Sequence, residues 1–217
     1  MIVTRQKTKD EITRMLKGQD KVFLIGCGEC ATICKTGGEP EVKAMQGSLT
    51  ACGKTITGVS IPSAPCLASK VKAELAKNIL ALKNSDAVLV LACGLGVQSV
   101  KENIRLERDI FPACDTLFGA VMDGRGDFYE KCLACGECVL DLTAGICPVT
   151  LCPKGMLNGP CGGMNKGKCE VDTERDCAWV LIYRQLEKKK KLDRMRQIQQ
   201  GKDHNKALRP HQLIMHK

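Results

Sequence analysis

The sequence is poor in aromatic residues and histidine, and it has no long apolar segment. Aromatic residues make up 3% of its 217 residues, and its three histidines, His204, His211 and His216, all lie near the C-terminus. The body of the chain therefore has no imidazole for a Cys2His2 zinc site or a Cys-His catalytic pair. The longest apolar run, residues 87–97, is too short to cross a bilayer, and no apolar core of a secretory signal is present. We predict a cytoplasmic protein without a membrane span.

Cysteine, by contrast, is abundant, with fifteen residues. Thiols stay reduced in the cytosol unless they hold metal or do redox work, and an odd number would leave one over in a set of disulfides. We therefore expect metal sites built from thiolates rather than disulfide bridges.

Positive charge is concentrated at one end of the chain. The formal net charge is +9, but the segment from Arg184 to Lys217 holds eleven of the 33 basic residues and only three of the 24 acidic ones. The rest of the chain has a net charge of +1, which does not favour a nucleic-acid-binding surface. We predict no nucleic-acid partner.

The first 127 residues alternate between strand and helix patterns. Four apolar runs favour strands, over residues 21–25, 56–61, 86–92 and 116–122. Two helical patterns lie at 68–83 and from 97 to about 108. Strands separated by helices are typical of a parallel sheet with right-handed crossovers. We predict an α/β fold with a small parallel-sheet N-terminal domain, flavodoxin- or Rossmann-like, over residues 1–127.

Two further regions follow this domain. Residues 128–180 are rich in loops and hold eight cysteines, so we expect bound metal rather than an apolar core to stabilise them. Residues 181–217 form a basic helix and tail, with the helix running from Cys177 to about Gln200.

The first late motif is C-x2-C-x2-C followed by a distant Cys-Pro. Its members are Cys132, Cys135, Cys138 and Cys147. Such spacing wraps three thiolates around one face of an iron–sulfur cube and predicts a [4Fe-4S] cluster, with a structural zinc knuckle as the alternative. Since Cys152-Pro153 repeats the final pair, either Cys147 or Cys152 could close the site.

A second late set is spaced less regularly, among glycines. It consists of Cys152, Cys161, Cys169 and Cys177. We interpret it as a second thiolate site, for zinc or another cluster; the alternative is a set of small buried apolar side chains.

An N-terminal set follows the first predicted strand directly. It comprises Cys27, Cys30 and Cys34, with Cys93 or Cys66 as a fourth ligand. Ligands of open α/β sheets bind beyond the carboxyl ends of strands, and a 2-1-3-4 strand order would bring Cys93 beside the first strand. We predict a second cluster here; the alternative is a redox-active C-x2-C thiol pair. Cys52 and Cys114 have no partners by spacing and are predicted to be packing residues.

The string C-P-K-G-M-L-N-G-P-C-G-G over residues 152–163, with Cys169 and Cys177-Ala-Trp179 after it, carries a resemblance. It resembles the cysteine-rich C-terminal family attached to methylenetetrahydrofolate reductases, often described as zinc-finger-like. The whole chain looks like the small iron–sulfur subunit of the acetogen-type enzyme of the Wood–Ljungdahl pathway.

The resemblance implies a non-catalytic electron relay in one-carbon metabolism. Its partners would be a flavin-containing large subunit, which reduces 5,10-methylenetetrahydrofolate to 5-methyltetrahydrofolate, and an electron-donor protein or complex. No residue of this chain is expected to be catalytic, and the flavin is expected on the large subunit. Two alternatives stay open: a zinc-stabilised adaptor whose basic helix binds nucleic acid or protein, and a thiol-disulfide oxidoreductase.

Overall fold

A computed structural model of the protein describes residues 1–215. It divides into two compact units, Met1–Phe118 and Gly119–Lys217. The last two residues of the predicted basic tail, His216 and Lys217, lie outside the described residues. No helix among residues 1–215 has the length and apolar character needed to cross a membrane.

The first unit is built on a four-stranded parallel sheet. Its strands are β2 (Lys21–Ile25), β3 (Thr55–Ser60), β4 (Ala87–Val90) and β5 (Asp109–Pro112), in the order β3-β2-β4-β5. This confirms the α/β fold and, for the first three predicted strands, the expected order. It is the order of the first four strands of a flavodoxin-like doubly wound sheet.

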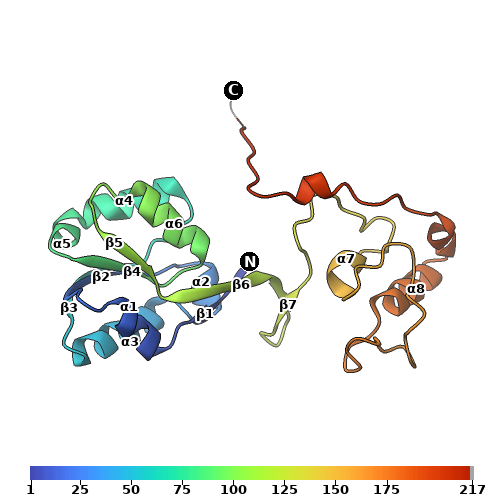
Figure 1. The fold of residues 1–217 in the computed structure, drawn as a ribbon, viewed down its shortest axis with the longest axis horizontal. Coiled ribbons are helices and arrows are strands. Elements are labelled where there is room, and N and C mark those ends of the chain that lie inside the picture. Colours follow the sequence, from blue (N-terminus) through green and yellow to red (C-terminus); the bar gives the residue numbers. More distant parts are fainter. Residues whose placement is uncertain (216–217) are drawn as a thin grey trace. The chain divides into compact units, whose positions relative to one another are not determined.

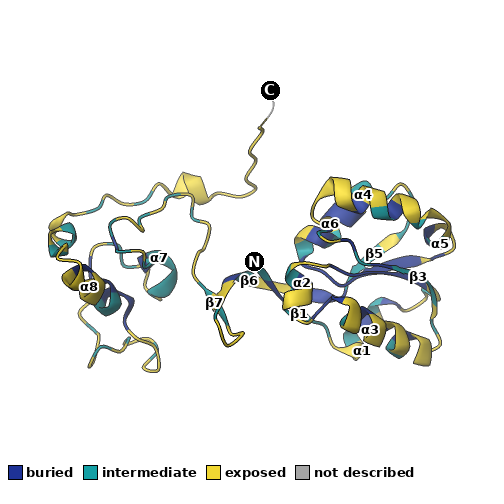
Figure 2. Cartoon of the chain, turned by 180° about the vertical axis from the view of Figure 1, so that it is seen from behind, coloured by how far each residue is buried: buried dark blue, intermediate teal, exposed yellow. Residues whose placement is uncertain are grey.

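Helices cover both faces of this sheet (Figure 1). One face carries α1 (Lys9–Met15) and α3 (Glu39–Ala51); the other carries α4 (Ala68–Lys77), α5 (Ile79–Lys83) and α6 (Gly94–Asn103). Side chains alternate along β2, so Val22 and Leu24 pack in the first core and Phe23 and Ile25 in the second. Both central strands are buried, as Figure 2 shows. The continuous apolar run of β2 is what a strand covered on both faces requires.

The fourth predicted strand, residues 116–122, is not part of the parallel sheet. It lies within β6 (Cys114–Met122), which pairs antiparallel with β7 (Phe128–Glu130). Together with β1 (Ile2–Gln6), these strands form a second sheet in the order β1-β6-β7. The fourth parallel strand is β5 instead. Its two apolar residues, Ile110 and Phe111, are too few to form a recognisable strand pattern.

Both helices predicted in the first unit differ in extent from the observed ones. The helix predicted over residues 68–83 is divided at Asn78, whose side-chain Nδ2 donates to the carbonyl of Glu74 at 2.9 Å. Such local side-chain bonds compete with the regular helical ladder. The helix predicted from 97 to about 108 is α6, which begins at Gly94 and ends at Asn103, where Ile104 is extended and the chain turns into β5.

The second unit has little regular structure and one small apolar core. After the end of β6 and β7, its elements are α7 (Pro148–Leu151), α8 (Ala178–Lys188) and two 3-10 helices, η1 (Leu192–Arg196) and η2 (His204–Ala207). The buried core residues are Cys177, Trp179, Ile182 and Leu186. Three of these four lie on α8 at helical spacing, so the cysteine-rich segment before it supplies only Cys177 to the buried set.

Helix α8 ends about twelve residues before the predicted boundary near Gln200. Lys190 adopts the left-handed conformation (φ 54°). Its N–H donates to the Glu187 carbonyl, and the N–H of Lys191 donates to the Leu186 carbonyl. These two bonds form a Schellman motif, which closes the helix. The run of four lysines therefore terminates the helix rather than extending it.

Candidate metal centres

The N-terminal cysteines lie at the topological switch point of the parallel sheet. Chain connections leave β2 and β4 in opposite directions, toward β3 and β5, and ligands of doubly wound folds bind beyond this pair of strand ends. The loop after β2 carries Cys27 and α2 (Cys30–Ile33), and Cys93 precedes α6 at the end of β4. A Cβ placed on Gly37 would lie 1.9 Å from the Leu91 carbonyl oxygen, so a glycine is needed for the loop to pack against the end of β4.

The thiols of Cys30 and Cys93 lie close enough to Cys27 to affect its pKa. Cys27 and Cys93 are buried, and Cys30 is half-buried. Burial raises the pKa of the Cys27 thiol, backbone hydrogen bonds at Ala31 and Glu29 oppose the rise, and the nearby thiols of Cys30 and Cys93 add to it. The structure therefore brings Cys93 to the C-x2-C pair, as the predicted strand order required.

Cys34 is held to the first strand together with Cys30. The Ile2 amide donates to Cys30 Sγ at 3.5 Å, and the Cys34 thiol donates to the Ile2 carbonyl at 3.7 Å. Cys114, predicted to be a packing residue, is 4% exposed in the first core, and burial raises the pKa of its thiol to about 12, with Cys93 and Cys34 among the further contributors. It follows the carboxyl end of β5. Recognition of β5 in the sequence would have indicated this fifth sulfur.

Cys66 is not brought to this group by any contact in the described residues. It is exposed, like Cys52, whereas Cys93 is buried and is among the groups that raise the pKa of Cys27. Of the two alternatives for a fourth N-terminal ligand, the geometry favours Cys93.

The first late motif forms an irregular loop between β7 and α7. The Ala134 amide donates to Cys132 Sγ at 3.4 Å, and Ala134 and Gly136 have positive φ angles of 52° and 75°. A non-glycine residue in this region is uncommon and is often found where a backbone turns its amides toward a ligand. Cys132 and Cys138 are exposed and Cys135 is half-buried.

Cys135 has an electropositive neighbour from the C-terminal tail. A backbone hydrogen bond at Glu137 lowers the pKa of the Cys135 thiol, burial opposes this, and the Lys202 ammonium lowers the pKa further. Lys202 also donates to the Glu137 carbonyl, and Lys206 Nζ lies 2.9 Å from Glu137 Oε1. These residues could not be predicted from the sequence, because about 65 positions separate them from the motif and no local pattern indicates such a contact.

The four cysteines of the second late set line one cavity. Cys152, Cys161, Cys169 and Cys177 border it, with Trp179 and the ion pair of Lys154 and Glu170. The Cys161 thiol donates to Glu170 Oε1 at 3.5 Å. Cys152 therefore belongs with this set, while Cys147 lies at the start of α7, where its thiol donates to Thr150 Oγ1 at 3.5 Å.

These donor sets are chemically suited to thiolate-bound metal. Within residues 1–215 no three Cys, His, Asp or Glu side chains are gathered tightly enough for a single metal ion. A cube of four irons holds its thiolates further apart than one ion does, and the amide and ammonium directed at Cys132 and Cys135 both favour thiolates. Cys152, Cys161, Cys169 and Cys177 border one cavity and are all sulfur donors, the type that structural zinc takes, but they are not gathered closely enough here to hold a single ion.

Comparison with known proteins identifies the second half of the chain. Residues 111–205 match the family model described as "Methylene-tetrahydrofolate reductase C terminal". This part of the chain is similar to the C-terminal family of methylenetetrahydrofolate reductases. The match covers less than half of the chain, and residues 1–110 lie outside it. Searches of curated proteins and of solved structures found no match.

Proposed function

We propose that this chain is an iron–sulfur electron relay that serves a flavin-bearing methylenetetrahydrofolate reductase subunit. One observation carries the proposal: all eight late cysteines, from Cys132 to Cys177, fall inside the segment that matches the reductase C-terminal family. Such a segment, with a small core of four buried residues, is suited to bound metal more than to a substrate pocket.

The proposed ligand sets follow the contacts described above. Cys132, Cys135, Cys138 and Cys147 would hold a [4Fe-4S] cluster, since Cys152 lines the other cavity. Cys27, Cys30, Cys34 and Cys93 would hold a second cluster at the switch point of the sheet. Cys152, Cys161, Cys169 and Cys177 would hold a structural metal, for which zinc fits the thiolate set.

When bound, a [4Fe-4S] cluster supplies one-electron redox chemistry. The chain's own residues hold the thiolates and direct amides such as that of Ala134 at sulfur. Electrons would pass to the flavin of the partner, which reduces 5,10-methylenetetrahydrofolate to 5-methyltetrahydrofolate.

Reconstitution of the complex tests this proposal. The anaerobically purified chain, reduced with dithionite and freed of excess reductant, is mixed with the flavin-bearing subunit, and flavin absorbance is followed by stopped flow. We expect flavin reduction that depends on this chain and is lost when Cys135 and Cys138 are both replaced by Ser. Replacement of Cys52, which is exposed and outside all three sets, is the matched control. Flavin reduction that is unchanged by the double replacement would contradict the relay function of the first late site.

A zinc-stabilised adaptor is the second candidate. The observation in its favour is the cavity bordered by Cys152, Cys161, Cys169 and Cys177, because four cysteines on one cavity supply the donor type that structural zinc takes. This candidate predicts a colourless protein that contains zinc and no iron, and that still binds the reductase subunit without transferring electrons.

A further inference from the structure

The C-terminal segment of residues 197–206 lies against the first late cysteine loop. Lys202 Nζ donates to the Glu137 carbonyl, between Cys135 and Cys138 in the loop. The Glu137 carboxylate is held at both oxygens, by Lys206 Nζ at 2.9 Å from Oε1 and by the Asp203 amide at 3.1 Å from Oε2. Glu137 is thus bound through its backbone and its side chain to the same short segment.

Close backbone packing adds to these polar contacts. A Cβ on Gly136 would lie 2.5 Å from the Lys206 carbonyl oxygen, and the residue has a φ of 75°. Glycine is therefore required at this position both by its conformation and by the approach of the tail. The segment contacts the loop through the backbone of Asp203 and Lys206 as well as through the side chains of Lys202 and Lys206.

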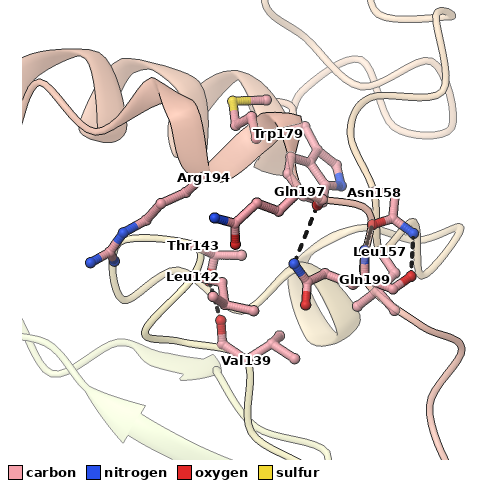
Figure 3. A pocket seen from close by; sticks show the side chains of 10 residues that line it. Val139, Leu142, Thr143, Leu157, Asn158, Trp179, Arg194, Gln197 and Gln199 are labelled. Carbon is pink, nitrogen blue, oxygen red and sulfur yellow. Dashed lines mark hydrogen bonds between the residues drawn. The ribbon is translucent and has the colours of Figure 1, made fainter.

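The start of the segment is anchored to the glycine-rich string after Cys152. Asn158 Nδ2 donates to the Gln199 carbonyl at 2.9 Å, and the Gln199 amide donates to Asn158 Oδ1 at 2.6 Å. Figure 3 shows this pair at the edge of a small pocket, to which Trp179 and Arg194 also contribute. This pair of hydrogen bonds fixes the chain at Gln199 and so limits where Lys202 and Lys206 can lie relative to the cysteine loop.

We propose that residues 197–206 are a clasp for the Cys132–Cys138 loop, in which Lys202 is a positioning residue that places a positive charge beside the thiolates. This inference rests on the proposed function in one respect, that a cluster occupies the loop. A cluster and its thiolates gain a negative charge on reduction, so a fixed ammonium stabilises the reduced form more than the oxidised form. The clasp would therefore raise the reduction potential of this centre and keep its loop closed.

The test replaces Lys202 in the full chain, purified anaerobically. The variant Lys202→Gln removes the charge and keeps an unbranched polar side chain that is one atom shorter. The control is Lys189→Gln, since Lys189 belongs to the same basic region and its side chain has no ion pair or hydrogen bond within the described residues. Redox titration followed by EPR reports the potential, and hydrogen exchange of the amides of residues 132–138 reports loop closure.

We expect Lys202→Gln to shift the reduction equilibrium about tenfold toward the oxidised form, which is about 59 mV for one electron, and to speed exchange in the loop. Lys189→Gln should do neither. Equal potentials and equal exchange in Lys202→Gln and the control would overturn the clasp even if iron is present. If the wild-type protein holds no iron, the proposed function is wrong. The contact between residues 197–206 and the loop is then tested by hydrogen exchange alone.

A second pair of variants keeps the test valid if Lys202→Gln folds poorly. Gly136→Ala and Gly145→Ala both place a Cβ at a positive φ, 75° and 89°, but only the first meets the Lys206 carbonyl, because nothing lies within 4 Å of a Cβ at Gly145. The clasp predicts faster exchange in residues 199–206 for Gly136→Ala and not for Gly145→Ala. The same exchange in both variants would contradict it.

Discussion

Removal of metal should unfold the second unit, and Trp179 is a built-in reporter of that event. It is the only tryptophan of the chain, it is 5% exposed, and its indole N–H donates to the Met156 carbonyl at 2.8 Å. Because Trp179 belongs to the core of this unit, its emission reports the folding of this unit and not that of the α/β unit.

The expected loss of stability on metal removal can be compared with the contribution of the small core of this unit. Only Cys177, Trp179, Ile182 and Leu186 are buried in it. Truncation of the fully buried Ile182 to Ala should cost about 2–5 kcal/mol in the free energy of unfolding. A structural zinc contributes about 10–16 kcal/mol in finger-sized peptides. Loss of metal should therefore outweigh the loss of a large core side chain.

The assay is urea unfolding followed by Trp179 emission, on the protein as purified and after treatment with a strong chelator. We expect chelation to shift the emission to the red without urea, whereas Ile182→Ala should only lower the urea midpoint of the metal-loaded protein. Leu24→Ala, a truncation of an equally buried residue in the α/β unit, is the control and should leave the Trp179 transition in place. A Trp179 spectrum and midpoint unchanged by chelation would refute the reasoning.

Three further predictions concern the α/β unit. At pH 8 iodoacetamide should label the exposed Cys52 and Cys66 and spare Cys114, since burial raises the pKa of Cys114 to about 12 and leaves almost no reactive thiolate. The labelled peptides are identified by mass spectrometry. Labelling of Cys114 as fast as that of Cys52 would contradict its burial, and protection of Cys66 only when metal is bound would contradict its place outside the N-terminal ligand set. Gly37→Ala should destabilise the unit by about 1–3 kcal/mol or more, because the added Cβ would clash with the Leu91 carbonyl. Gly47→Ala inside α3, with open space around it, should instead stabilise the unit by up to about 1 kcal/mol. Thermal melts followed by circular dichroism compare the two variants, and equal melting temperatures would contradict this prediction. Thr8→Ala should cost about 0.5–2 kcal/mol, since it removes the capping box that Thr8 forms with Glu11 at the start of α1; an unchanged urea midpoint would argue against this cap.

The parts of the fold that sequence could predict are those with strong local patterns. The apolar run of β2 is bounded by the same residues in the sequence and in the structure, because a strand buried on both faces has to be apolar throughout. The position of Cys27 and Cys93 at neighbouring strand ends followed from strand order, since the two residues come shortly after β2 and β4.

The rest depends on contacts between distant parts of the chain. Strand β5 has two apolar residues after a charged stretch, and it is identified only by its pairing with β4. Failure to see β5 also hid the position of Cys114. The contact of Lys202 with Glu137 joins residues 65 positions apart and leaves no periodic signal in the sequence. Spacing in the late cysteines left Cys152 ambiguous, and the cavity it shares with Cys161 provided the spatial information that spacing lacks.

The most direct measurement is a count of iron, acid-labile sulfide and zinc per chain, with EPR of the dithionite-reduced protein prepared without oxygen together with the proposed reductase partner. The account predicts at least four irons and four sulfides per chain, about one cube, a brown colour and a reduced-state EPR signal. A colourless protein with zinc alone and no EPR signal would contradict it.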